Sequence, residues 1–207
     1  MLVAAVVLSF AAVLGATIGA GELLANAERP DGSTGIDRSI TSWFVEHRAS
    51  WLTTVARALS TIGSQKVLLP LVAVVTIVLI VRGARRQAVL LVVIWAGAIE
   101  LYTLAKSVVD RPRPPMHLWL TSASSTAFPS GHATQSLSTF AALALVSAAV
   151  VSTARRPALA VAVVIAAGVG CSRVYLGVHW ATDVLAGWLA AACWVALIAW
   201  LAHTRKT

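Results

Sequence analysis

Long apolar runs separated by short polar segments dominate this chain. Apolar residues nearly fill the stretches 2–21, 67–81, 87–106, 131–152, 158–174 and 179–202. Most of these runs approach the length of about 20 residues that an α-helix needs to cross a bilayer. Helices also satisfy every backbone polar group internally, as lipid requires. The pattern therefore predicts an all-α integral membrane protein, a bundle of six transmembrane helices that forms a single domain over residues 1–207.

The first apolar run has an alternative interpretation as a cleaved signal peptide, because Ala25, Asn26 and Ala27 resemble a small-residue cleavage site. No Lys or Arg precedes the run, however, and it exceeds the usual apolar core of about 7–15 residues. Both features favour a retained span. Gly15 and Gly19 form a GxxxG pair in it, which we expect to pack inside the bundle rather than to mediate dimerisation.

Residues 22–65 form the one sizeable polar stretch of the sequence. Apolar side chains recur near helical spacing from Ile36 to Ile62, with most charged side chains opposite them. This arrangement is typical of a helix that lies in the membrane interface. A soluble mini-domain is the alternative, but about 40 residues offer little core for independent folding. We therefore predict an outer insertion over about 22–65 that contains an interfacial amphipathic helix between spans one and two.

Composition and charge agree with a membrane protein. The 207 residues are 58% hydrophobic and 12% charged, with a formal net charge of +8. A nucleic-acid-binding protein would gather its basic residues on one soluble face, whereas here they occupy the turns 82–86 and 155–156 and the tail 203–206. The positive-inside rule makes these segments cytoplasmic. We therefore expect no nucleic-acid partner, cytoplasmic N- and C-termini in the plasma (inner) membrane, and outer loops at 22–65, 107–130 and 175–178.

Ionisable side chains gather at the predicted outer ends of the last four spans. Three of them are cations, Lys106, Arg113 and Arg173. Facing cations repel one another unless an anion lies between them, so this end of the bundle is predicted to bind an anionic group. Ser130 and Gly131 precede the fourth span, where the free N–H groups of a helix start suit a phosphate.

Two histidines belong to the same set of span ends. His132 opens the fourth span and His179 opens the sixth, with Asp183 four residues later. If the last helix begins near Gly177, His179 and Asp183 share one of its faces. The carboxylate would then fix which imidazole nitrogen carries the proton. This pairing is typical of an activated nucleophile.

The three segments together resemble the signature of the type 2 phosphatidic acid phosphatase family, which comprises multi-span lipid phosphate phosphatases related in their core to vanadium haloperoxidases. Lys106 is followed after six residues by Arg113-Pro114, next comes Pro129-Ser130-Gly131-His132, and Ser172-Arg173 is followed after five residues by His179 and after three more by Asp183. Every motif position matches in order, and the predicted layout resembles the family's membrane branch over about residues 1–202.

The resemblance implies a role for each of these residues. His179 would attack phosphorus and form a phosphohistidine, Asp183 would orient it, and His132 would protonate the leaving oxygen. The phosphate oxygens would be held by Lys106, Arg113, Ser130, Gly131 and Arg173. The site would face the periplasm or extracellular space, and the substrate would be a lipid phosphate of the surrounding bilayer. Undecaprenyl diphosphate is slightly favoured over phosphatidic acid and phosphatidylglycerol phosphate.

The predicted site contains few metal-binding groups. A two-metal phosphatase needs several carboxylates, whereas the outer ends of the last four spans offer Asp110 and Asp183, with Glu100 deeper. We therefore predict metal-independent hydrolysis with no cofactor. We expect Arg111 to pair with Asp110 in solvent.

Several questions stay open at this point. Glu22 and Glu100 receive no firm role, although Glu100 is a candidate partner for Lys106. The oligomeric state is undetermined. Two other functions compete with hydrolysis, a lipid phosphotransferase that uses the same phosphohistidine and a non-catalytic binder or transporter of anionic lipids.

Overall fold

The computed structural model describes residues 2–26, 31–148 and 155–204, which are helical with connecting loops and contain no strand. The helices are α1 (Leu2–Ala25), α2 (Gly35–Glu46), α3 (Ser50–Ile62), α4 (Gln65–Val81), α5 (Arg85–Val108), the short 3₁₀ helix η1 (Met116–Leu118), α6 (Gly131–Ala148), α7 (Arg155–Tyr175) and α8 (Ala181–His203). The end of the candidate cleavage site, the end of the expected fourth span and the basic tail 205–206 lie outside the described residues.

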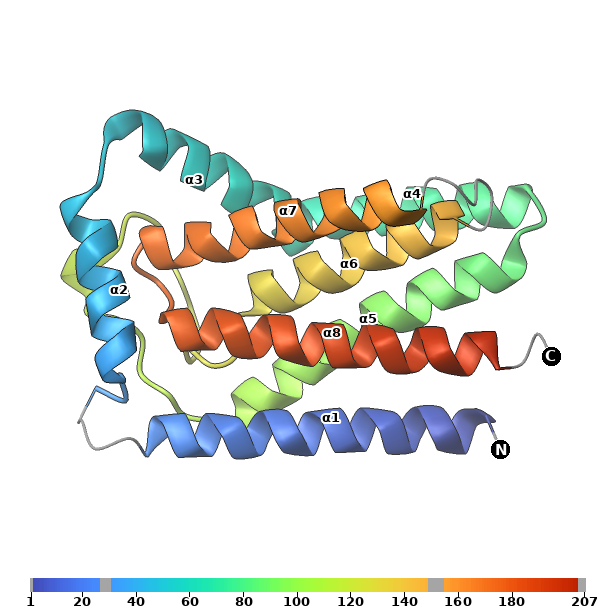
Figure 1. Ribbon diagram of the computed structural model, residues 1–207, viewed down its shortest axis with the longest axis horizontal. Coiled ribbons are helices and arrows are strands. Elements are labelled where there is room, and N and C mark those ends of the chain that lie inside the picture. The colour runs from blue at the N-terminus through green and yellow to red at the C-terminus, as the bar shows by residue number, and fades with distance from the viewer. Residues whose placement is uncertain (1, 27–30, 149–154, 205–207) are drawn as a thin grey trace.

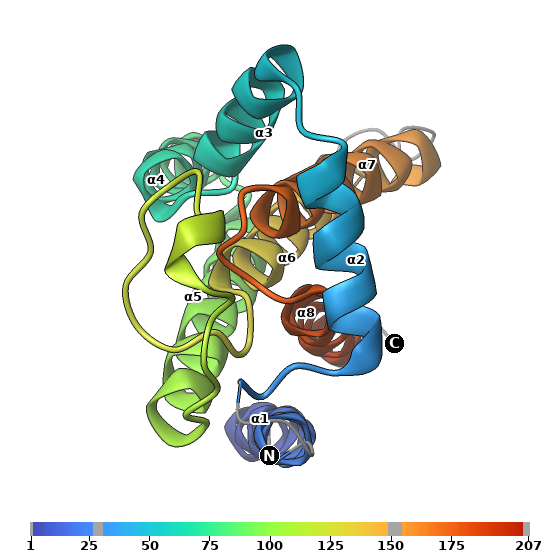
Figure 2. The ribbon, with the colours of Figure 1, turned by 90° about the vertical axis from the view of Figure 1, so that its left-hand side faces the viewer.

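The long helices run alongside one another, with α6 in the middle of the bundle (Figures 1 and 2). It packs against α4, α5, α7 and α8. Five polar side chains in its first half are buried, namely Thr134, Gln135, Ser136, Ser138 and Thr139. A central position suits this helix because its polar face is shielded from lipid by its neighbours.

The structure identifies four helices that are each long and apolar enough to cross a membrane, α1, α5, α7 and α8. The pair α3 and α4 passes the same test as one segment bent by 44° at the break between them, which gives up to five candidates among the described residues. The polar first half of α6 keeps it out of this set. The all-α membrane class is thus confirmed, whereas the count of six spans is not.

The insertion at 22–65 contains two helices where one interfacial helix was expected. Helix α2 lies across one end of the bundle, over the ends of α7 and α8 (Figure 2), and α3 leads into α4. Thr34 caps α2 in a reciprocal capping box with Asp37. The buried face of α2 carries Asp37 and Thr41, which are polar. A position in the membrane interface is therefore not confirmed for this segment.

The helix ends that carry the predicted site residues meet at the end of the bundle covered by α2. These are the C-terminal ends of α5 and α7 and the N-terminal ends of α6 and α8, while the start of α1 and the end of α8 lie at the opposite end (Figure 1). The turn between α4 and α5, with Arg82, Arg85 and Arg86, also lies at that opposite end. The basic segment 82–86 and the predicted site thus lie at opposite ends of the bundle, as the sequence pattern predicts.

Close packing of α5 on α8 depends on Gly97. A Cβ atom at this position would lie 2.3 Å from Cζ2 of Trp194, whose indole N–H donates to the Ile94 carbonyl at 3.0 Å. This hydrogen bond holds the indole in place, so the ring cannot easily move to accommodate a Cβ atom at position 97. We expect Gly97→Ala to lower the free energy of unfolding by about 1–3 kcal/mol, the usual cost of overpacking, as measured by thermal unfolding in detergent.

Gly19 supplies the matched control for this prediction. A Cβ at Gly15 or Gly19 would meet nothing within 4 Å, so the expectation that this pair packs inside the bundle is wrong. Gly19→Ala should leave the unfolding temperature unchanged or raise it slightly, because Ala favours the helix. Equal destabilisation by both substitutions would contradict the packing argument for Gly97.

Candidate active site

A cavity of about 280 Å³ opens at the α2-covered end of the bundle. Six of the eight residues predicted to form the site line its wall, Lys106, Arg113, Gly131, His132, Arg173 and His179. The other two, Ser130 and Asp183, are fully buried. The structure therefore gathers side chains from α5, α6, α7 and the loops 109–130 and 176–180 around one hollow.

His179 lies in a turn and not on a helix. The turn contains Gly177, whose φ of +74° favours glycine, and a Cβ there would lie 2.2 Å from the Leu118 carbonyl oxygen. Helix α8 starts only at Ala181, with Trp180 as its N-cap residue. The expectation of a helix from Gly177 is therefore wrong, because this close backbone approach imposes a left-handed residue.

The imidazole of His179 is held between Asp183 and Arg113. Its Nδ1 lies 3.4 Å from Oδ2 of Asp183, too long for a regular hydrogen bond. Its Nε2 lies 3.1 Å from Nη1 of Arg113. Because a guanidinium can only donate, Nε2 must accept, and the proton of the neutral ring belongs on Nδ1, facing the carboxylate.

The charge state of His179 follows from its surroundings. Burial and then the positive charges of Arg113, Lys106 and Arg173 lower the pKa of this imidazole well below its usual value. Desolvation and nearby cations both disfavour a protonated ring. His179 is therefore a neutral imidazole with its lone pair on Nε2, the form that can attack an electrophile.

Two of the cations are fixed by carbonyl groups of the loop 109–130. Arg113 donates from Nε to Ser125 at 2.9 Å and from Nη2 to Ser124 at 3.0 Å. Lys106 donates from Nζ to Thr126 at 2.6 Å. Burial lowers the pKa of the Arg113 guanidinium, an effect that the Asp183 carboxylate partly offsets. These contacts pre-organise positive charge at the cavity before any anion arrives.

Arg173 is hydrogen-bonded to the last turn of α3, close to the bend between α3 and α4. Its Nη1 donates to the Ser60 hydroxyl, while its Nε has no hydrogen-bond partner among the described residues. Nearby, Gln135 donates from Nε2 to the Gly63 carbonyl at 2.8 Å. The polar stretch before α4 thus supports the cavity, a contribution that no motif in the sequence indicates.

Ser130 stands immediately before α6, where its backbone holds helix ends together. Its N–H donates to the Asp183 carbonyl at 3.0 Å, and its own carbonyl accepts from the Thr134 N–H at 3.0 Å. The hydroxyl has no partner among the described residues. The side chain thus leaves the helix uncapped and keeps its hydrogen-bonding capacity for another group.

Arg111 and Asp37 belong to the surroundings of the site, although the sequence pattern assigned neither residue to it. Arg111 is fully buried and pairs with Asp183 at 2.5 Å and with Asp37 at 2.8 Å. The expected pairing with Asp110 in solvent is therefore wrong, since Asp110 is exposed. The spacing of Thr34 and Asp37 could have indicated a capping box, but nothing in the sequence places Asp37 beside Arg111.

The structure also bears on the expected partner of Lys106 and on metal binding. Glu100 is exposed and forms no ion pair with Lys106 in the described part of the chain. Within residues 2–26, 31–148 and 155–204, no cluster of three or more His, Cys, Asp or Glu side chains could hold a metal ion. Metal-independent turnover stays a prediction.

Comparison with known proteins identifies the family. The sequence profile of the PAP2 superfamily matches residues 87–207. Phosphatidylglycerophosphatase B of Bacillus subtilis is 30% identical over 168 residues, which span 80% of this chain and 82% of that protein. Undecaprenyl-diphosphatase of Sulfolobus acidocaldarius is 34% identical over 136 residues, 63% of this chain and 61% of that one.

Two crystal structures share the fold. The transmembrane PAP2-type phosphatidylglycerolphosphate phosphatase of Bacillus subtilis superposes with a TM-score of 0.79 at 26% identity, covering 96% of this chain and 94% of that one. LpxE of Aquifex aeolicus gives a TM-score of 0.65 at 22% identity, over 81% of this chain and 97% of that one. The chain belongs to the PAP2 superfamily. It is an integral membrane protein and, by class, a phosphatase.

Proposed function

We propose that this protein hydrolyses the phosphate or diphosphate monoester of a membrane lipid through a phosphohistidine intermediate on His179. One observation carries the proposal: the neutral imidazole of His179 borders the cation-lined cavity with Arg113 at Nε2 and Asp183 at Nδ1. A phosphate in the cavity would take over the Arg113 N–H, which frees the Nε2 lone pair to attack phosphorus.

The proposed cycle has two steps. In the first, Nε2 of His179 bonds to phosphorus as the bond to the lipid oxygen breaks. His132, whose protonated form the negative charge of the bound phosphate would stabilise, gives its proton to that oxygen. In the second, water attacks the phosphohistidine, neutral His132 takes a proton from the water, and inorganic phosphate leaves. Lys106, Arg113, Arg173, Ser130 and the Gly131 amide would stabilise the equatorial oxygens where negative charge accumulates.

We further propose six membrane crossings, with α3 and α4 as one bent crossing and α6 as the central one. The even number and the basic residues of the turn between α4 and α5 support cytoplasmic termini. The α2-covered end with the cavity would then face the periplasm or extracellular space, at the outer leaflet of the plasma membrane. Reporter fusions at Gly83 and in the 109–130 loop should report opposite sides.

The activities of the two relatives suggest candidate substrates for this protein. One is a phosphatidylglycerophosphatase and the other an undecaprenyl-diphosphatase, so phosphatidylglycerol phosphate and undecaprenyl diphosphate head the candidates, followed by phosphatidic acid. All three present a terminal phosphate on a lipid, which is the chemistry that a cationic cavity at the bundle end would accept. The fold by itself does not choose among them.

A phosphate-release assay on purified protein tests the proposal. We expect release of inorganic phosphate from at least one of the three lipids, no release by His179→Ala, and unchanged rates in EDTA, because side-chain cations already neutralise the phosphate. Loss of activity in EDTA that added metal restores would contradict the metal-independent mechanism.

The same assay separates the two competing functions. Release without any second acceptor argues against a phosphotransferase, which needs that acceptor to turn over. Lipid phosphate binding with neither release nor an acid-labile phosphoenzyme would identify a non-catalytic binder.

A further inference from the structure

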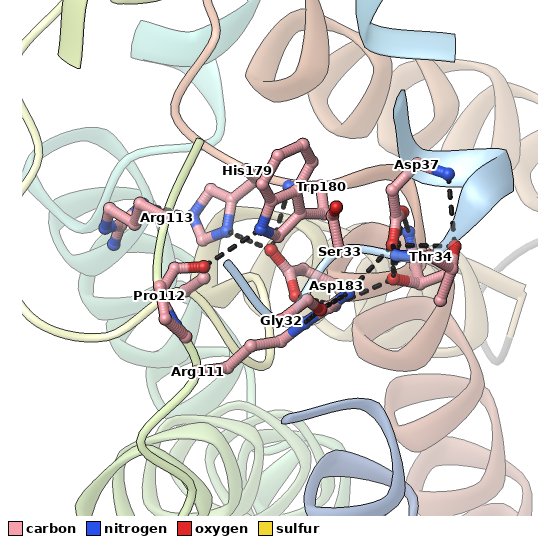
Figure 3. Close-up of polar contacts among 12 residues, drawn as sticks. Gly32, Ser33, Thr34, Asp37, Arg111, Pro112, Arg113, His179, Trp180 and Asp183 are labelled. Atoms are coloured by element: carbon pink, nitrogen blue, oxygen red, sulfur yellow. Dashed lines mark hydrogen bonds and ion pairs between the residues drawn. The ribbon is translucent and has the colours of Figure 1, made fainter. Parts of the chain in front are cut away.

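Arg111 uses its entire hydrogen-bonding capacity inside the protein. A guanidinium has five N–H donors, and here all five are bonded (Figure 3). Nε and Nη2 both donate to the Gly32 carbonyl, at 3.0 and 2.9 Å. The remaining N–H groups reach the Thr182 hydroxyl at 2.7 Å, Asp183 at 2.5 Å and Asp37 at 2.8 Å. No donor is left for a substrate.

Asp37 is equally saturated. Its Oδ1 accepts from the Thr182 N–H at 2.9 Å, and its Oδ2 accepts from the Thr34 N–H at 3.1 Å and from Arg111 at 2.8 Å. Burial by itself raises the pKa of this carboxyl, but the N–H groups of Thr182 and Thr34 and the Arg111 charge outweigh it and hold the pKa below its ordinary value. Asp37 is therefore a buried carboxylate, with Arg111 as its counterion.

The buried network of Arg111, Asp37, Thr182 and Asp183 fixes both carboxylate oxygens of Asp183. Oδ1 faces Arg111 at 2.5 Å, and Oδ2 accepts from the Trp180 N–H at 2.8 Å and lies 3.4 Å from Nδ1 of His179. The Trp180 indole in turn donates to the Pro112 carbonyl at 2.9 Å. Because Arg111 restrains one oxygen, the other stays directed at the imidazole (Figure 3).

Asp37 affects the electrostatics of the site in addition to packing in its surroundings. Arg111 shares one positive charge between two carboxylates, so the three groups together carry one net negative charge. Without Asp37, Arg111 would neutralise Asp183 alone, and the field at His179 from Lys106, Arg113 and Arg173 would go unopposed. A nucleophilic imidazole becomes positive when it attacks phosphorus, and this excess negative charge stabilises that product.

We propose that Asp37 and Arg111 are positioning residues that hold Asp183 against His179 and supply the net negative charge behind the imidazole. The inference rests on the proposed roles of His179 and Asp183. Asp37 lies on α2, outside residues 87–207 that match the superfamily profile. The insertion thus completes the surroundings of the site in addition to covering the end of the bundle.

Asp37→Asn is the decisive substitution. Asn keeps the shape of Asp but has one oxygen, so one of the donors from Thr182 and Arg111 must face an amide N–H. We expect kcat to fall by about 10- to 100-fold with KM within about threefold, since a displacement near 1 Å at reacting groups costs about 100-fold. Asp37→Glu, which restores charge and both oxygens, should recover part of the loss.

Asp31→Asn is the matched control from the same segment. Asp31 pairs with Arg38 at 2.7 Å, but these side chains are 34% and 49% exposed. Surface ion pairs contribute little, so kcat should stay within about twofold of wild type. A wild-type kcat in folded Asp37→Asn protein would overturn the proposal.

A spectroscopic measurement distinguishes a role of Asp37 in positioning Asp183 against His179 from a role in stabilising the fold alone. In the ¹⁵N spectrum of histidine-labelled protein, His179 should show its proton on Nδ1 in wild type and in Asp31→Asn, and a mixture of tautomers in Asp37→Asn. A fall in kcat with unchanged His179 signals would contradict the proposed route. This measurement needs no substrate, so it still tests the positioning role if no lipid phosphate is hydrolysed.

A second variant covers the case in which Asp37→Asn does not fold. Thr182→Val removes the hydroxyl that accepts from Arg111 and donates to Asp37, but it keeps the backbone N–H. We expect the same directions of change in kcat and in the His179 signals. Wild-type values for both in this variant would then overturn the proposal.

Discussion

Replacing His179 by Ala should reduce kcat by at least about 10⁴-fold, the largest effect of any single substitution in this protein. Loss of a nucleophile removes the covalent route altogether, and single losses in concerted catalytic groups reach this size or more. A factor of 10⁴ corresponds to about 5.5 kcal/mol of transition-state stabilisation. The measurement is initial-rate phosphate release from a lipid phosphate in mixed micelles.

A second result should accompany this loss. Lys106, Arg113 and Arg173 remain in the variant, so its affinity for the lipid phosphate should change by less than about tenfold, whereas a phosphoenzyme should be absent. Wild type mixed rapidly with ³²P-labelled lipid should yield an alkali-stable, acid-labile label, as expected of a phosphohistidine.

His117→Ala is the control for the His179 substitution. His117 is an exposed histidine of η1 in the loop 109–130, and its replacement should leave the rate unchanged. Turnover by His179→Ala within tenfold of wild type, or an acid-labile label that persists in it, would contradict the assignment of His179 as nucleophile.

The class of fold could be predicted because lipid imposes a simple rule. Apolar runs of about 20 residues can hardly be anything but spanning helices, and α1, α5, α7 and α8 agree with them. The bent pair of α3 and α4 was harder to predict. Helix α3 carries Arg57 and several hydroxyl residues, so its hydropathy alone does not indicate that it passes the length and hydropathy test together with α4.

The cavity-lining residues could be predicted for a different reason. Lys106, His132 and Arg173 lie at helix ends, and His179 lies in the turn just before α8. Helices of similar length bring alternate ends to the same side of a bundle. Chain order and span length therefore fixed their proximity without any knowledge of side-chain packing. The left-handed residue Gly177 could not be predicted, because it depends on the approach of the Leu118 carbonyl from a distant loop.

The buried network behind the site illustrates where sequence analysis reaches its limit. Arg111 and Asp37 are 74 positions apart, and their ion pair exists because α2 lies across α8. In the sequence, nothing distinguishes Arg111 and Asp37 from ordinary solvent-exposed charged residues. For this reason the sequence favoured an ion pair between Arg111 and its neighbour Asp110, which the described part of the chain does not contain. A short polar helix leaves no periodic signal strong enough to fix where it docks, and its docking decides the partners of both residues.

Replacing His132 by Gln should reduce kcat for a lipid phosphate by about 10²–10⁴-fold, the range for a general acid–base group. The loss should depend on the leaving group, because an alkoxide must be protonated as it leaves whereas p-nitrophenolate is stable without a proton. With p-nitrophenyl phosphate, formation of the phosphoenzyme should therefore be nearly normal. Its hydrolysis should still be slow, because neutral His132 is the proposed base for water.

A pre-steady-state measurement shows this difference directly. His132→Gln should release a burst of p-nitrophenolate of about one equivalent per active site, followed by slow turnover and a stable phosphohistidine label on His179. His47→Gln is the matched control, since His47 is an exposed histidine stacked on Trp43 of α2, and it should behave as wild type on both substrates. Equal losses on both substrates without a burst would show that His132 binds phosphate and transfers no proton, because only proton transfer makes its importance depend on the basicity of the leaving oxygen.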